Sequence, residues 1–241
     1  MLKISLMLGA LAALADVVGG AILVRARVVE HYLRYCVALG AGFLMATAVL
    51  EMTPESLKIS PTLGPVLIMA GYCAVHLLEH TINAHFHFGE ETHADEFVSQ
   101  HTSYSVLAGL SVHALFDGVA IGSGFVVSNR LGWLIFLAIL LHKIPEGFTI
   151  ASIMLASGRS RSAAFVSSVA LAAATLAGVA VIQLAPGLLL VGMPVSAGVA
   201  IYVAATDLVP EVNREPGIRM ALIFFAGVGA FLLLRVLLPA I

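Results

Sequence analysis

The sequence predicts an all-α membrane protein with eight transmembrane helices, and two observations lead to this prediction. Of the 241 residues, 60% are hydrophobic and only 11% are charged, and the mean hydropathy is +1.03, which lies outside the range of a water-soluble domain. Apolar runs of about 20 residues, the length that crosses a bilayer, recur along the whole chain. Backbone groups in lipid must be hydrogen-bonded within their own segment, so these runs are expected to be helices.

The apolar runs follow one another with short polar or Pro/Gly turns between them, so residues 1–241 are expected to form a single transmembrane domain. The first run resembles a signal peptide at its start, but it continues past Asp16 to Val24 and is closed by Arg25 and Arg27. We therefore expect it to span the membrane. The eight segments are 4–24, 33–57, 63–84, 103–127, 131–156, 162–184, 188–209 and 217–239.

The distribution of basic residues predicts the orientation in the membrane. Positive charge is concentrated in the odd-numbered loops, and the positive-inside rule assigns those loops to the cytoplasm. Both termini are then extracytoplasmic in a multi-pass protein of the cell (inner or plasma) membrane. The long third loop, about 85–101, is acidic and rich in histidine, and it is expected to face the cytoplasm. The odd-numbered loops hold Arg25, Arg27, Arg34, Arg159, Arg161, Arg214 and Arg219.

An internal similarity relates the second and seventh segments. The run GFLMATAVLEMTPES at 42–56 can be aligned with GVAIYVAATDLVPEV at 198–212, which pairs Glu51 with Asp207. The two segments run in opposite directions by the span count. This is the pattern of an inverted repeat that relates helices 1–3 to helices 6–8, a feature typical of transporters.

The fourth and fifth segments each carry the pattern His-x-x-x-carboxylate-Gly. The two copies are HALFDG, which starts at His113, and HKIPEG, which starts at His142. Residues four apart on a helix lie about 6 Å apart on one face, so His113 with Asp117 and His142 with Glu146 can each hold one side of an ion. The sequence therefore predicts one metal site with four ligands between two helices.

The chemistry of these ligands suits a borderline divalent ion. Two imidazoles and two carboxylates bind Zn²⁺, Fe²⁺, Mn²⁺, Cd²⁺ or Co²⁺, whereas a tight structural zinc or copper(I) site would use thiolates. Lys143 and Glu146 inside one spanning helix require a polar interior. Pro145 is expected to kink that helix, and the small residues Ala114, Gly118 and Gly122 are expected to let a neighbouring helix approach.

Several further polar residues are weaker candidates. His76, Glu79 and His80 have helical spacing near the cytoplasmic end of the third helix. They could form an exit station, that is, a site that binds the metal on its way out, or they could simply be polar residues at the membrane interface. Asp207 is a candidate pathway residue. Asp16 is an ionisable residue inside a predicted membrane span, which makes it a candidate functional residue. No partner for it is evident in the sequence. The third loop could collect metal or be a solvated linker, and its candidate ligands are His85, His87 and His93.

At the paired motifs the chain resembles the ZIP (Zrt-, Irt-like protein) family of divalent metal transporters, over essentially its whole length. The resemblance rests on the two motifs in the fourth and fifth of eight helices, the histidine-bearing third loop and the extracytoplasmic termini. It implies a 3+2+3 helix arrangement and import of Zn²⁺ or a similar ion. It also implies metal held by His113, Asp117, His142 and Glu146, and an elevator-like movement of the metal-bearing helices.

One departure from the family pattern concerns the number of ions. Members with a two-metal centre carry Asn and an acidic or amide residue directly after the motif histidines, where this chain has Ala114 and Lys143. The ammonium of Lys143 could replace the second ion and neutralise Glu146, and the sixth segment offers no acidic residue to complete a second site. A single metal ion per site is expected.

Two other functions use the same residues. In an intramembrane metallohydrolase, His113, Asp117 and His142 would bind zinc while Glu146 activates a water, although no HExxH signature is present. In a membrane metal sensor, the third loop would report metal status to a soluble partner. The charge pattern, with a net charge of only −2, gives no sign of a nucleic-acid partner, and no nucleotide-binding motif occurs. The oligomeric state is open, a homodimer included.

Overall fold

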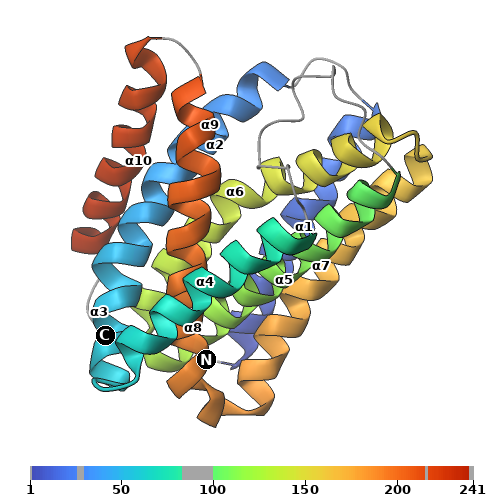
Figure 1. Cartoon of the computed structure of the whole chain (residues 1–241). Helices are drawn as coiled ribbons and strands as arrows, with labels where there is room; N and C mark the ends of the chain where they lie inside the picture. Colours follow the sequence, from blue (N-terminus) through green and yellow to red (C-terminus); the bar gives the residue numbers. More distant parts are fainter. Residues whose placement is uncertain (1, 26–29, 83–99, 215–216, 239–241) are drawn as a thin grey trace.

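The computed structural model describes residues 2–25, 30–82, 100–214 and 217–238, and every regular element within these ranges is helical. The described residues form eight continuous helical rods, two of which contain a short π-helical stretch (Figure 1). The elements are α1 (Leu2–Arg25), α2 (Glu30–Thr47), η1 (Ala48–Met52), α3 (Thr53–Ile59), α4 (Gly64–Ile82), α5 (Gln100–Val127), α6 (Asn129–Ala156), α7 (Arg161–Leu184), η3 (Pro186–Leu188), α8 (Leu189–Tyr202), η4 (Val203–Leu208), α9 (Val209–Arg214) and α10 (Ile218–Leu237).

Seven of the eight rods are long and apolar enough to cross a membrane, as judged from length and composition within the described residues. The prediction of an all-α membrane protein is therefore confirmed. The eighth rod is α4, which covers the third predicted segment with 19 residues. It is not one of the seven candidate spans, and His76, Glu79 and His80 lie in its last two turns. The described part of the predicted 63–84 span, Gly64–Ile82, is thus helical.

The rods pack as two groups of helices. In the first helix group, α1 packs against α6 and α7, and α5 packs against α6 and α7. In the second helix group, α2 packs against α10, and α4 packs against α8. The two groups meet mainly where α6 contacts α2 and where α5 contacts α8. The largest cluster of buried apolar side chains includes residues from both groups, such as Phe43, Phe125 and Ile139.

Close contacts inside each group are made by pairs of glycines. At each of eight glycines an added Cβ atom would overlap the backbone of the partner helix, so these helices approach at their backbones. Between the groups the fit is looser: a Cβ atom at Gly40 or Gly192 would find its nearest neighbours 3.0–3.4 Å away. The eight glycines are Gly19 and Gly147 (α1 with α6), Gly118 and Gly178 (α5 with α7), Gly42 and Gly227 (α2 with α10), and Gly71 and Gly198 (α4 with α8).

The second and seventh segments share a local irregularity. The π-helical stretch η1 interrupts the rod that begins with α2, and η4 interrupts the rod that begins with α8. Glu51 lies in η1 and Asp207 lies in η4, the two carboxylates that the sequence alignment pairs. A π-helical turn adds one residue to a helix, and such turns are frequently found at functional sites.

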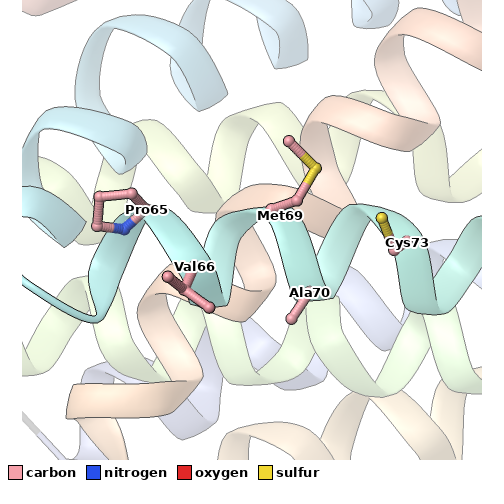
Figure 2. Close-up of a pocket in the computed structure, with 5 residues that line it drawn as sticks. All are labelled: Pro65, Val66, Met69, Ala70 and Cys73. Carbon is pink, nitrogen blue, oxygen red and sulfur yellow. The ribbon is translucent and has the colours of Figure 1, made fainter.

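The outer face of α4 carries a shallow apolar groove of about 460 Å³ (Figure 2). Its walls are Pro65, Val66, Met69, Ala70 and Cys73, all from α4 itself. Val66 and Met69 are each more than 60% exposed, as expected for side chains that face lipid. The groove has no carboxylate or imidazole in its lining, so it is not a candidate for binding a metal ion.

Candidate metal centre

The two sequence motifs lie opposite each other in the first helix group, His113 and Asp117 on α5 and His142 and Glu146 on α6. All four side chains are buried. The glycine that ends each motif fixes the position of the motif relative to a neighbouring helix. Gly118 packs on the backbone of Thr175 in α7, and Gly147 packs on the backbone of α1. A larger residue at either glycine would push away the helix that encloses the carboxylate.

The four side chains converge on one point. One ligand atom from each lies within 4.8 Å of the others, and within the described part of the chain this is the one group of three or more such residues. Nε2 of His113 and Nε2 of His142 each lie 3.3 Å from Oδ2 of Asp117. Nε2 of His113 lies 4.0 Å from Oε2 of Glu146. Tetrahedral zinc with bonds of about 2.0–2.2 Å has ligand atoms about 3.3–3.6 Å apart. The two His–Asp spacings fit such an ion, whereas the 4.0 Å spacing to Glu146 is longer, so this carboxylate would have to move inward to bind as well.

The orientation of His142 is set by the backbone. Its Nδ1 lies 2.9 Å from the carbonyl oxygen of Ala138, one turn earlier on α6. Because a carbonyl oxygen only accepts, Nδ1 must carry the proton, and Nε2 of the neutral ring then presents a lone pair toward Asp117. Oδ2 of Asp117 lies 3.3 Å from this nitrogen, so a cation between the two atoms would be bound by both, and a proton on Nε2 would be donated to the carboxylate in its absence. Nδ1 of His113 has no hydrogen-bond partner among the described residues.

Lys143 is the centre of the charge network beside these ligands. Its Nζ donates to Oε2 of Glu146 at 2.7 Å, and it lies 3.0 Å from Oδ2 of Asp117 and 3.6 Å from Oδ2 of Asp16. Both Lys143 and Asp16 are fully buried. The expected polar interior therefore includes α1 as well as α5 and α6, and Asp16 has a partner that the sequence analysis did not find.

The small residues of α5 have a different role from the one expected. The stripe of Ala114, Gly118 and Gly122 was expected to bring together the two helices that share the ion, but Gly118 and Gly122 face α7. Ala114 is buried in an apolar cluster with Ile150. The two glycines of the stripe therefore bring α7, and not α6, close to α5, and the expectation is corrected for these two residues. The helix α6 continues through Pro145 without interruption.

The remaining candidates lie outside this centre. His76 and His80 are exposed on α4 with their rings 4.1 Å apart. Glu79 accepts a hydrogen bond from the hydroxyl of Tyr202 at 2.8 Å, and Asp207 is buried in η4 and hydrogen-bonded to Thr206. Tyr202 thus joins α4 to the rod of α8, a role that the sequence analysis missed. The loop candidates His85, His87 and His93 lie outside the described residues.

A second ionic cluster was also missed by the sequence analysis. Glu51 entered the sequence analysis only as the residue aligned with Asp207, but its side chain is mostly buried between two arginines. Nε of Arg235 lies 2.6 Å from one carboxylate oxygen, and Nη2 of Arg130 lies 3.6 Å from the other. Arg130 belongs to α6 and Arg235 to α10, so this cluster connects the two helix groups. The signal in the sequence was an acidic residue inside an apolar segment.

A small cavity lies between the two helix groups, and one of the four ligands, Asp117, lines it. Asp117 lines it from α5, Ile135 from α6, Leu44 from α2 and Ser196 from α8. The hydroxyl of Ser196 donates to the carbonyl oxygen of Phe116 at 3.1 Å, a polar contact across the boundary. The carboxylate of Asp117 therefore faces both the ligand cluster and the boundary between the groups.

Fold and site together define a polytopic membrane protein with a buried metal-binding centre between two of its helices. Comparison with known proteins agrees with this class of protein. The profile of the family described as "ZIP Zinc transporter" matches residues 89–235, which is more than half of the chain. The protein belongs to the ZIP family.

Individual relatives are zinc transporters by name. The chain is 31% identical over 163 residues to zinc transporter ZIP9 of Micropogonias undulatus, which covers 61% of this chain and 51% of that protein. It is 30% identical over 163 residues to ZIP9 of Xenopus tropicalis, with 61% and 52% covered. It is 31% identical over 148 residues to human zinc transporter SLC39A7, with 57% and 32% covered. The match thus spans about half or less of the length of these relatives.

Proposed function

We propose that this protein imports a divalent transition metal, Zn²⁺ foremost, into the cytoplasm through a single intramembrane site. The ligands are His113, Asp117, His142 and Glu146. One observation carries the proposal: four buried ligand atoms from two helices lie within 4.8 Å of one another, and both imidazoles lie 3.3 Å from one oxygen of Asp117, a spacing that fits a tetrahedral ion. Membership of the ZIP family and the names of the relatives support zinc as the cargo.

The ligand set favours transport over permanent binding or hydrolysis. Sites without thiolates release borderline ions more readily than Cys-rich structural sites. A hydrolase would need Glu146 as a base for water, whereas here Glu146 is one of the four buried groups whose ligand atoms converge on one point. Fe²⁺, Mn²⁺, Cd²⁺ and Co²⁺ tolerate the same ligands and are alternative cargoes.

The charges around the site favour one ion over two. Asp117, Glu146 and Asp16 supply three carboxylates, and Lys143 supplies one ammonium in contact with all three. The net charge of the ionised cluster is then two negative charges, which one divalent ion neutralises. A second divalent ion would leave an excess of positive charge buried without a counter-charge, which is strongly unfavourable.

The packing of the helices supports an elevator-like movement. Backbone-to-backbone glycine contacts hold the helices together within each group, while the described contacts across the boundary are made by side chains, among them the hydrogen bond from Ser196 and the ion pair between Arg130 and Glu51. A group built in this way can shift as a unit. We take the first helix group, which holds the metal ligands, as the moving part and the second helix group as its frame.

An inverted repeat with a 3+2+3 arrangement is consistent with the same contacts. If helices 1–3 correspond to helices 6–8, then α1 matches α7, α2 matches α8 and α4 matches α10. The glycine pairs obey this correspondence: Gly42 of α2 and Gly198 of α8 both contact the backbone of a peripheral helix. The motif glycines Gly118 and Gly147 contact α7 and α1 in the same way, and η1 and η4 occupy aligned positions.

The path beyond the site follows from the predicted orientation. With both termini extracytoplasmic, the polar end of α4 lies toward the cytoplasm, and Glu79, Asp207, His76 and His80 form an exit station. The hydrogen bond from Tyr202 to Glu79 supports this assignment by holding one carboxylate beside the buried Asp207. The loop histidines, in this proposal, collect or sense the released ion in the cytoplasm.

Metal uptake into proteoliposomes tests the proposal. Wild-type protein is compared with His142→Ala and Glu146→Gln, using Zn²⁺, Fe²⁺, Mn²⁺, Cd²⁺ and Co²⁺ in turn. We expect time-dependent uptake by the wild type and its loss in both variants. Glu55→Gln is the matched control, because Glu55 pairs with the exposed Lys58 away from the site, and it should transport normally. Cross-linking in the same vesicles reports whether the protein is a homodimer.

The outcomes separate the alternatives. Metal binding that depends on His142 but gives no flux in sealed vesicles would favour the sensor. Metal-dependent cleavage of an added peptide or ester, without flux, would favour the hydrolase. Flux that is unaffected by either substitution would contradict the assignment of the ligands.

A further inference from the structure

Lys143 competes with the metal for its ligands. Its Nζ contacts Oδ2 of Asp117 and Oε2 of Glu146, and these same atoms face the imidazole nitrogens of His113 and His142. A divalent ion bound to both oxygens would lie only a few ångströms from the ammonium. Two cations at that distance in a buried site repel each other strongly. The ammonium must therefore move when the ion arrives.

Asp16 is the group that can receive the ammonium. Its Oδ2 lies 3.6 Å from Nζ of Lys143, which is longer than a hydrogen bond by less than 1 Å. Neither of its carboxylate oxygens has a hydrogen-bond partner among the described residues, although the side chain is fully buried. A buried carboxylate that lacks a hydrogen bond is unfavourable, so a small movement of Lys143 toward Asp16 would turn their ion pair into a hydrogen-bonded one.

The position of Asp16 is fixed by the packing of α1 on α6. Gly147 has no side chain, and the backbone of Asp16 occupies the space that a Cβ atom would need. This contact fixes the register of α1 so that Asp16 lies beside the turn of α6 that holds Lys143 and Glu146. Asp16 is one of the helix α1 residues with no exposed surface, so solvent cannot replace it as a partner for the ammonium.

We propose that Asp16 is a positioning residue that receives the ammonium of Lys143 when a divalent ion binds to Asp117 and Glu146. In this scheme Lys143 is a tethered counter-ion: it occupies the carboxylates before the ion binds and returns to them after the ion leaves. Asp16 does not touch the metal and acts through Lys143 alone. The inference rests on the proposed function, since it assumes that the four predicted ligands hold the ion.

A double-mutant cycle tests this role. The full-length protein is purified in detergent, and Zn²⁺ affinity is measured by competition with a chromophoric chelator at fixed pH. The variants are Asp16→Asn, Lys143→Met and the double variant, with Lys143→Gln as a second neutral replacement should Lys143→Met fail to fold. Asn has the shape of Asp without its charge, and Met has the approximate length of Lys without its ammonium.

We expect Asp16→Asn to weaken Zn²⁺ binding by about tenfold or more in the presence of Lys143, within the usual range of coupling between contacting residues. Without the ammonium, the same substitution should weaken binding by no more than about threefold, because only a distant charge is removed. An equal loss in both backgrounds, or no loss in either, would overturn the proposal.

Cobalt distinguishes a positioning residue from a ligand. Co²⁺ in a tetrahedral site has visible absorption bands that respond to its ligands. At saturating Co²⁺ the spectrum of Asp16→Asn should match that of the wild type, and a changed spectrum would make Asp16 a ligand and contradict the proposal. His142→Ala is run in parallel: if it binds Zn²⁺ like the wild type, the proposed function fails, whereas loss in His142→Ala with an unaffected Asp16→Asn rejects only the role of Asp16.

Discussion

Replacing Gly118 by Ala should weaken both the fold and the metal site. An added methyl carbon would lie at little more than half the ordinary contact distance of about 3.5 Å from the carbonyl oxygen of Thr175. The atom it meets belongs to the backbone of α7, which cannot turn aside like a flexible side chain. The helices α5 and α7 must therefore separate by more than about 1 Å. Overpacking of this kind destabilises a protein by about 1–3 kcal/mol.

The same separation reaches the metal ligands because Gly118 directly follows Asp117. A shift of α5 by about 1 Å exceeds the tolerance of roughly 0.5 Å within which a binding constellation must be held. Oδ2 of Asp117 now lies 3.3 Å from both imidazole nitrogens, and it cannot keep both distances after such a shift. We expect the affinity for Zn²⁺ to fall about tenfold, equivalent to 1.4 kcal/mol.

The assay compares thermal unfolding and Zn²⁺ affinity in detergent for Gly118→Ala and for Gly229→Ala. Gly229 lies in α10, and a Cβ atom there would meet nothing within 4 Å. This control therefore reports the intrinsic effect of exchanging glycine for alanine in a helix. If the Gly118→Ala protein is as stable as the control and binds Zn²⁺ as tightly as the wild type, the packing argument is wrong.

Two further predictions concern protons and the Glu51 cluster. Lowering the external pH from about 7.5 to about 5.5 should slow Zn²⁺ uptake in proteoliposomes, because protons compete with the ion for imidazole and carboxylate ligands. An uptake rate that rises with acidity would contradict this prediction. Glu51→Gln should lower the unfolding temperature, since it leaves two arginines without their shared carboxylate. The control Glu55→Gln, which removes an exposed pair, should leave the unfolding temperature nearly unchanged. Equal effects of the two substitutions would show that the Glu51 cluster is not important for stability.

Much of the site could be predicted because it depends on spacing within single helices. Residues four apart share a face of any α-helix, so His113 with Asp117 and His142 with Glu146 were identifiable before the helices were placed. Apolar length marked the segments for the same local reason. Even the irregular stretches η1 and η4 left the segments around them helical, so the expected boundaries fall within a few residues of the helical rods.

The features that were missed depend on how different helices are rotated and aligned. Asp16 and Lys143 are far apart in the sequence, and nothing local shows that α1 and α6 share a register set by Gly147. The two residues were nevertheless an intramembrane anion and an intramembrane cation, and the need of each for a partner was the available signal. The stripe that ends in Gly122 was assigned to the wrong neighbour for a related reason: a row of small residues shows that some helix approaches, but not which one.

The hydrogen bond between His142 and the carbonyl of Ala138 has a consequence for mutational studies. The group that fixes the tautomer of this ring is a main-chain carbonyl, so it is present whatever side chain occupies position 138. Systematic alanine replacement across α6 would therefore leave this anchor intact and assign it no importance. Chemistry that edits the backbone, such as exchange of the peptide bond after residue 138 for an ester, which makes the carbonyl a poorer acceptor, would expose its contribution.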